Sequence, residues 1–136
     1  MASYGGEMTR IVEHANRETF LVIQVETPEA LAQLPEIASV PGVDGIFYGP
    51  ADMALRMALQ PTEKRVSYED ALGRIAAQAE RQGKFWGSMP ANLDQMRDLA
   101  QRGAHLIPWQ NDLALIKQGL VLRSQELDAI YAELRR

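Results

Sequence analysis

Gly42-Val-Asp-Gly-Ile-Phe-Tyr-Gly-Pro-Ala-Asp-Met53 is the stretch of this 136-residue sequence that decides the fold. Its apolar run, residues 45–48, predicts a short buried strand. The strand runs into Gly49-Pro-Ala-Asp52, and short helical turns are expected from there to about Leu59. A strand that leads directly into a helix is the repeating unit of parallel α/β sheets.

The same alternation continues on both sides of that stretch. A helix is expected before the first strand, over residues 7–17, and Pro35 is expected to split the helix after that strand into two pieces. The remaining helices are expected from Ser67 to Gly83, over residues 92–102 and over residues 111–134. The four predicted strands comprise residues 20–26, 45–48, 85–89 and 105–109.

Four βα units and a preceding helix within residues 1–136 predict a single α/β domain with a parallel sheet. Such a pattern fits an open flavodoxin-like sheet, and it also fits one half of an eight-stranded parallel barrel. Periodicity alone does not choose between these two folds.

Composition argues against several classes of protein. A net charge of −4 without a basic patch gives no electrostatic basis for binding nucleic acid. The absence of cysteine rules out disulfides and thiolate metal sites. No apolar run approaches the roughly 20 residues needed to span a bilayer, and residues 1–10 lack a signal-peptide core. A cytoplasmic protein is therefore expected.

Function in a parallel α/β fold is expected at the carboxyl ends of the strands. Glu26 ends an apolar run, where a carboxylate is costly unless it is paired or bound to a cation. Asp52 occupies the same end of the next strand, so the two carboxylates could share one divalent ion. Alternatively, Glu26 pairs with an arginine and Asp52 only caps a helix. The residues at these strand ends are Gln24, Glu26, 49–52, Ser88, Met89 and 109–112.

Residues Gly49 to Asp52 suggest a second element of the site. A glycine between a strand and a helical turn lets backbone N–H groups point at a ligand, and a helix N-terminus favours an anion. Because Pro50 has no N–H, the donors would be Ala51 and Asp52. A small carboxylate such as pyruvate fits better than a phosphate, since no long glycine-rich loop is present. The alternative is an ordinary strand-to-helix turn.

Leu21-Val-Ile-Gln-Val-Glu26-Thr and Gly42 to Met53, with the spacing of their two acids, strongly resemble the HpcH/HpaI aldolases, the group that includes 4-hydroxy-2-oxoheptanedioate and 2-dehydro-3-deoxy-glucarate aldolases. The likeness continues more weakly through Gly83-Lys-Phe-Trp-Gly and Gln110-Asn-Asp112. The resemblance implies that residues 1–136 form the C-terminal half of a (β/α)8 barrel of the phosphoenolpyruvate/pyruvate type.

The resemblance also implies the chemistry. Glu26 and Asp52 would bind a divalent metal, Mg²⁺ or Mn²⁺ with Co²⁺ as a further option, which holds the keto-acid oxygens of pyruvate. Backbone amides of Gly49 to Asp52 would hold its carboxylate, and Gln24 would line the pocket. The implied reaction is a reversible aldol cleavage of 2-oxo acids, with pyruvate as donor and an aldehyde or 2-oxo acid as partner. Trp109, at the end of the fourth strand, is a candidate for shaping the substrate pocket.

A Schiff-base aldolase is the rival reaction type, and it needs a lysine at the top of a strand. Lys84 begins a strand, Lys64 lies in a polar connection and Lys117 lies in the last helix, so the metal route is preferred.

The family's arginine and its histidine-based proton-transfer group belong to the half that has no counterpart here. His14 is expected to be solvated and His105 begins a strand, so both are interpreted as structural. Trp86 is expected in the core and Arg56 at the surface. The alternative function is therefore an inactive, truncated half-barrel that self-associates and still binds metal and pyruvate.

Four strands cannot close such a barrel, so the chain is expected to be a fragment, to pair with a second copy through its edge strands, or to rearrange into an open sheet. The last helix carries an apolar stripe that is broken at Arg123 and suits its own sheet or a partner helix. A homo-oligomer is predicted. The stripe comprises Leu113, Ile116, Leu120, Leu127, Ile130 and Leu134.

Overall fold

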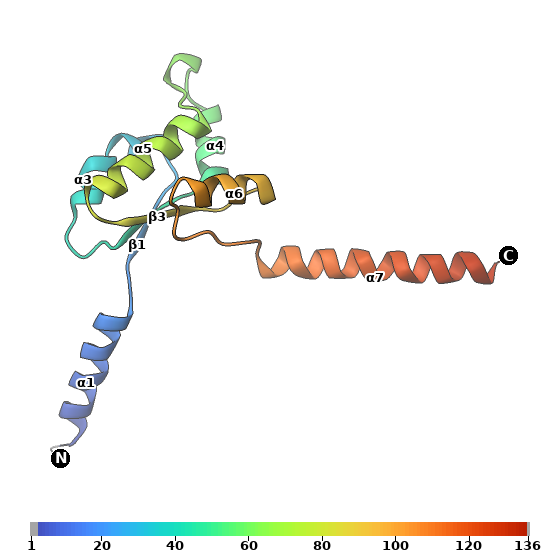
Figure 1. Ribbon diagram of the computed structural model, residues 1–136, viewed down its shortest axis with the longest axis horizontal. Coiled ribbons are helices and arrows are strands. Elements are labelled where there is room, and N and C mark those ends of the chain that lie inside the picture. The colour runs from blue at the N-terminus through green and yellow to red at the C-terminus, as the bar shows by residue number, and fades with distance from the viewer. Residues whose placement is uncertain (1–2, 136) are drawn as a thin grey trace.

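The computed structural model describes residues 3–135 and contains a three-stranded parallel sheet in the order β1-β2-β3 (Figure 1). β1 spans Val22–Val25, β2 spans Gly45–Tyr48 and β3 spans Phe85–Ser88. Ile46 in the central strand stands opposite Ile23 on one side and Trp86 on the other. Consecutive strands are joined through helices, as parallel pairing requires.

Seven α-helices surround or extend from the sheet in the described part of the chain. Pro35 does split the segment after β1 into two short helices, as predicted, because proline at the start of a helix is favoured while proline inside one removes a hydrogen bond. The helices are α1 (Ser3–Glu18), α2 (Pro28–Ala32), α3 (Leu34–Ser39), α4 (Pro50–Ala58), α5 (Tyr68–Arg81), α6 (Leu93–Gln101) and α7 (Asp112–Leu134), with a 3₁₀ turn, η1, at Thr62–Lys64.

Side chains that accept backbone N–H groups mark where several of these helices begin. Thr27 Oγ1 accepts the Ala30 N–H at 3.0 Å, and Ser67 Oγ accepts the Asp70 N–H at 3.1 Å. Each bond satisfies one of the N–H groups that a helix start leaves without a partner. Residue types readable in the sequence therefore fix these boundaries.

The two faces of the sheet have different surroundings. Successive side chains of a strand point to opposite faces, so Val25, Ile46 and Trp86 share one face, which is buried beneath helices that include α3 and α5. Gln24 is exposed and Phe47 is only partly buried on the other face. In Figure 1 the helices of the sheet's own βα units lie on one side of it. The second face is the one that a closed barrel would turn inward.

The predicted fourth strand, residues 105–109, is wrong in its extent. The structure contains only an isolated parallel bridge between Gly87 and Leu106. The His105 N–H donates to the Trp86 carbonyl at 2.8 Å, and the Ser88 N–H donates to the Leu106 carbonyl at 3.1 Å. Pro108 then removes a donor that a longer ladder would need. The pairing therefore stops after one bridge.

The terminal helices α1 and α7 project away from the sheet (Figure 1). α7 has the bounds expected from the sequence, and α1 extends beyond residues 7–17 at both ends. No residue of α7 is buried, so its apolar stripe does not pack on its own sheet. The turn into α7 passes through Gln110, whose φ of 62° lies in the left-handed region. Within residues 3–135, no helix has the length and apolarity to cross a membrane.

Candidate metal and oxo-acid site

The site begins at the end of β1, where two polar side chains leave the strand on the same face. Gln24 and Glu26 are separated by Val25, whose side chain is buried in the core. The Gln24 Nε2 group donates to Glu26 Oε2 at 2.5 Å. Because residues two apart in a strand share a face, the apolar run that buries Val25 also presents both polar groups outward from the helix-covered side. The bond limits the positions open to the Glu26 carboxylate.

Gly49 lies directly against this pair. Its N–H donates to the Val25 carbonyl at 3.0 Å, which holds the end of β2 beside the end of β1. A Cβ at position 49 would lie 2.8 Å from Gln24 Nε2, 2.8 Å from Glu26 Cβ and 3.0 Å from Glu26 Oε2. The space that a side chain would occupy is thus already filled by Gln24 and Glu26.

Helix α4 starts at the same place. Gly49 is its N-cap and offers no side-chain acceptor, and Pro50 follows at the first helical position. Among residues 3–135 no acceptor is found for the N–H groups of Ala51 and Asp52, whereas the Met53 N–H donates to the Gly49 carbonyl at 3.1 Å. Free N–H groups at a helix start form a site for an anion. Asp52 is exposed in this first turn.

The donor set suits a hard divalent cation. Carboxylate and amide oxygens are the ligands that Mg²⁺ and Mn²⁺ prefer, and waters or substrate oxygens complete an octahedron. In the described part of the chain no three His, Cys, Asp or Glu side chains are grouped as a metal site. Glu26 and Asp52 alone would leave an ion with open coordination positions, which water or substrate oxygens would have to fill.

The other strand ends contribute less than the sequence suggested. Ser88 is fully buried, and its Oγ donates to the Tyr48 carbonyl at 3.2 Å, so it belongs to the core. Met89 and Trp109 are 39% and 40% exposed. Among the described residues, Trp109 makes no hydrogen bond or ring contact to Glu26 or to any other part of the chain.

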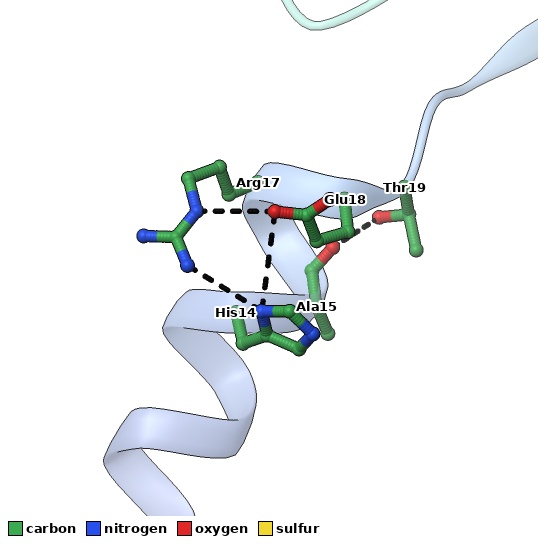
Figure 2. A network of polar contacts seen from close by, with 5 residues as sticks. All are labelled: His14, Ala15, Arg17, Glu18 and Thr19. Carbon is green, nitrogen blue, oxygen red and sulfur yellow. Dashed lines mark hydrogen bonds and ion pairs between the residues drawn. The ribbon is translucent and has the colours of Figure 1, made fainter.

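Two expectations for the remaining candidates are confirmed: Trp86 is buried, and Arg56 is exposed. His14 lies on α1, with its Nδ1 atom 3.4 Å from Arg17 Nη2 and 3.9 Å from Glu18 Oε1 (Figure 2). The His14 side chain is 67% exposed, so it is solvated. It belongs to a helix that projects away from the sheet.

Lys84 is engaged at the opposite end of the sheet from Glu26. Its Nζ donates to the backbone carbonyls of Val40 and Val43. These contacts hold the loop that precedes β2, and they keep the amine away from the carboxyl ends of the strands.

Behind the site, the buried Tyr48 lies beside the partly buried Tyr68, a pair that sequence reasoning did not single out. The rings of Tyr48 and Tyr68 lie 5.6 Å apart with an interplanar angle of 53°. Burial raises the pKa of Tyr48 to about 12, and burial also raises the pKa of Tyr68. Both phenols remain neutral at physiological pH and act as packing groups beneath β2, the strand that precedes Gly49.

The sequence model of the HpcH/HpaI aldolase/citrate lyase family matches residues 2–118. The chain belongs to this family. The resemblance first seen in residues 21–27 and 42–53 is thereby confirmed.

Two curated relatives extend the family comparison. A hydroxypyruvate/pyruvate aldolase of Sagittula stellata is 35% identical over 121 residues, covering 89% of this chain and 48% of the relative. A 4-hydroxy-2-oxo-heptane-1,7-dioate aldolase of Klebsiella pneumoniae is 33% identical over 122 residues, covering 87% of this chain and 44% of the relative. The chain thus spans about half the length of these curated relatives.

A solved structure gives the same picture of the fold. An HpcH/HpaI aldolase/citrate lyase family protein from Burkholderia cenocepacia superposes with a TM-score of 0.74 and 25% identity, over 90% of this chain and 48% of that protein. The predicted fold class, parallel βα units of a TIM-type barrel, is confirmed. The described sheet is a part of that architecture.

Proposed function

We propose that this chain provides the metal- and oxo-acid-binding part of a divalent-metal-dependent lyase of the pyruvate aldolase type. The observation that carries the proposal is the contact of the Gln24–Glu26 pair with Gly49, at the point where α4 begins and presents Asp52. Family membership supports the reaction class, and both relatives described above are named as aldolases of oxo acids.

Glu26 and Asp52 are the proposed metal ligands, for Mg²⁺ or Mn²⁺ and alternatively Co²⁺. Gln24 donates to one oxygen of Glu26 and so orients the other oxygen toward an ion. When bound, such an ion supplies a Lewis acid that stabilises negative charge on a keto-acid oxygen. A divalent ion would also offset the carboxylate charges of Glu26 and Asp52.

The N–H groups of Ala51 and Asp52 are the proposed receptors for the carboxylate of pyruvate. They lack acceptors within the described chain, and the α4 dipole adds partial positive charge. Pro50 has no N–H to contribute, so two amides define a site the size of one carboxylate rather than of a phosphate. Trp109 is retained as a candidate for the wall of the substrate pocket.

A second candidate function is a module that binds metal and pyruvate without turnover. It is favoured by the positions of the two histidines, since His14 lies on the projecting α1 and His105 lies where the chain enters the bridge to β3. Neither of them stands beside Glu26 and Asp52, so the chain's own histidines do not supply the proton transfer that an aldol cleavage needs.

The test combines binding with turnover. The purified chain is titrated with Mn²⁺, with free Mn²⁺ measured by electron paramagnetic resonance, and is then incubated with pyruvate and an aldehyde. Glu26→Ala and Asp52→Ala are each expected to weaken Mn²⁺ binding at least tenfold, whereas Glu36→Ala, an exposed carboxylate on α3, is the matched control.

The outcomes separate the two functions. Mn²⁺ binding with aldol product supports the aldolase. Mn²⁺ binding without product supports the binding module. Mn²⁺ binding that survives both Glu26→Ala and Asp52→Ala contradicts the proposed site.

Self-association is part of the proposal. The exposed apolar residues of α7 and the free edge of β1 are two surfaces through which a homo-oligomer could form.

A further inference from the structure

We infer that Gly49 sets the gap between Glu26 and Asp52 and thereby selects a small divalent ion over a large one. The inference rests on the proposed function, because it concerns the same pair of carboxylates. It assigns to Gly49 a positioning role that does not depend on its backbone N–H. Because Gly49 has no Cβ, the segments that present Glu26 and Asp52 can lie close together.

The backbone conformation does not explain a glycine at this position. Gly49 has φ −93° and ψ 88°, and that negative φ is open to other residues. Gly42, with φ +83°, shows what a conformational requirement looks like in this chain, and a Cβ there would meet nothing within 4 Å. Position 42 therefore favours glycine because of its backbone conformation, whereas position 49 favours glycine because a side chain there would collide with its neighbours.

The contact is with an atom that cannot move aside. Of the atoms that a Cβ at position 49 would approach, Gln24 Nε2 is the end of a flexible side chain and can rotate away. Glu26 Cβ, at 2.8 Å, is bonded directly to the backbone of the segment that leaves β1. An added methyl group therefore has to move that backbone relative to Gly49.

The displacement would reach both carboxylates. Gly49 is tied to β1 through its N–H bond to the Val25 carbonyl and to α4 through the bond from Met53 to its own carbonyl. Glu26 lies on the β1 side of the added methyl, and Asp52 lies on the α4 side, three residues after Gly49. Separating these two segments changes the distance that a shared ion has to bridge.

The separation of the two carboxylates affects which ion binds, because divalent ions differ in size. Mg²⁺ binds oxygens at about 2.0–2.1 Å in a strict octahedron, whereas Ca²⁺ accepts about 2.3–2.6 Å and a flexible arrangement. Mn²⁺, like Mg²⁺, takes six oxygen ligands in an octahedron, so it serves as the probe for the smaller ion. A widened pair of carboxylates is expected to lose a small ion more readily than Ca²⁺.

The test measures two ions on three variants of the full chain. Mn²⁺ affinity is determined by electron paramagnetic resonance, and Ca²⁺ affinity is determined by competition against Mn²⁺. Gly49→Ala is expected to weaken Mn²⁺ binding at least tenfold and to raise the ratio of Ca²⁺ to Mn²⁺ affinity at least threefold.

Two glycines provide matched controls. Gly45→Ala lies at the other end of β2, where its Cβ would meet the Phe85 ring, so it disturbs the sheet away from the site. Gly73→Ala lies in α5 and meets nothing within 4 Å. Both controls are expected to keep the wild-type ratio of Ca²⁺ to Mn²⁺ affinity, although Gly45→Ala is expected to lower the urea midpoint.

A change in selectivity is a readout that simple loss of stability would not produce. If Gly49→Ala weakened the binding of both ions equally, or left Mn²⁺ binding unchanged, the inference would be wrong. The proposed function would still stand, provided that the wild type binds Mn²⁺. Absence of Mn²⁺ binding in the wild type would overturn the proposed function itself, and this inference would fall with it.

Discussion

The apolar residues of the central sheet and its helices are buried, whereas those of the last helix are exposed. Ile46 and Leu72 are fully buried between the sheet and α5, whereas Leu113 and Leu120 in α7 are 71% and 67% exposed. In the central part of the chain, the apolar side chains of the sheet and its helices are buried against one another. α7 has 23 residues, and none of them is buried against the other described residues, whereas helices in proteins gain most of their stability from packing an apolar face. The difference teaches that α7 needs a surface that its own sheet does not provide.

The distribution of apolar residues along α7 sharpens this point. At 100° per residue, the apolar side chains between Leu113 and Leu122 are spread around the helix, whereas those from Leu127 to Leu134 fall on one side. A helix that is apolar all round suits burial on several sides, and one with a single stripe suits burial on one side. The first half of α7 is therefore suited to contacts with a partner on several sides, and the second half is suited to contacts on one side.

The largest expected effect is on the free energy of unfolding, when a leucine side chain is shortened to alanine in the core or in α7. Leu72→Ala removes a fully buried side chain and is expected to lower the free energy of unfolding by about 2–5 kcal/mol. Leu120→Ala, at a protein concentration where the chain is monomeric, is expected to change it by less than about 0.5 kcal/mol. Urea denaturation measures both values. Similar losses in the two variants would break the comparison and would show that the chain covers α7 in solution.

The next effect concerns self-association through α7. Leu120→Glu places a charge on the apolar half of the helix and is expected to weaken any self-association at least tenfold, or about 1.4 kcal/mol. Light scattering over a range of concentrations gives the mass. Glu126→Gln, a polar change on the same helix, is the control. A wild-type chain that is monomeric throughout would contradict the oligomer proposal.

Helix caps give a smaller contrast between the same two regions. Ser67→Ala removes the cap of the packed α5 and is expected to cost about 1 kcal/mol of global stability. Asn111 Oδ1 accepts the Ala114 N–H at 2.8 Å at the start of α7, so Asn111→Ala is expected to reduce helicity without shifting the urea midpoint. Circular dichroism separates the two effects. A shifted midpoint in Asn111→Ala would indicate that α7 unfolds together with the sheet.

The smallest effect at neutral pH comes from a buried phenol. Burial raises the pKa of Tyr48 from 10.0 to about 12, so the folded state holds the phenolic proton more tightly than the unfolded state does. The resulting stabilisation is complete below pH 10 and is lost as the pH rises toward 12. Tyr48→Phe is expected to flatten the decline of stability over this range. Tyr131→Phe, at an exposed position of α7, is the matched control, and equal flattening in both variants would contradict the assignment.

Local signals in the sequence were sufficient for much of the fold. The run at residues 45–48 predicted β2 because apolar residues favour a buried strand, and Pro35 predicted the break between α2 and α3. Ser67 predicted a helix start, since its hydroxyl oxygen accepts an N–H group only a few residues away. The fourth strand was overestimated because a strand exists only where a neighbour pairs with it.

The candidate site was divided in the same way. The sequence by itself determined the family and the helix start before Asp52, because these depend on residue type and spacing along the chain, and it predicted Glu26 and Asp52 as the metal ligands. Only the tertiary structure decided that Gln24 bonds to Glu26, that Ser88 faces the core, and that the missing side chain of Gly49 makes room for the pair. The space around Gly49 depends on how β2 lies beside β1, and the burial of Ser88 depends on how β3 packs against the core. Both are set by packing between segments about twenty or more residues apart, and no local pattern encodes them.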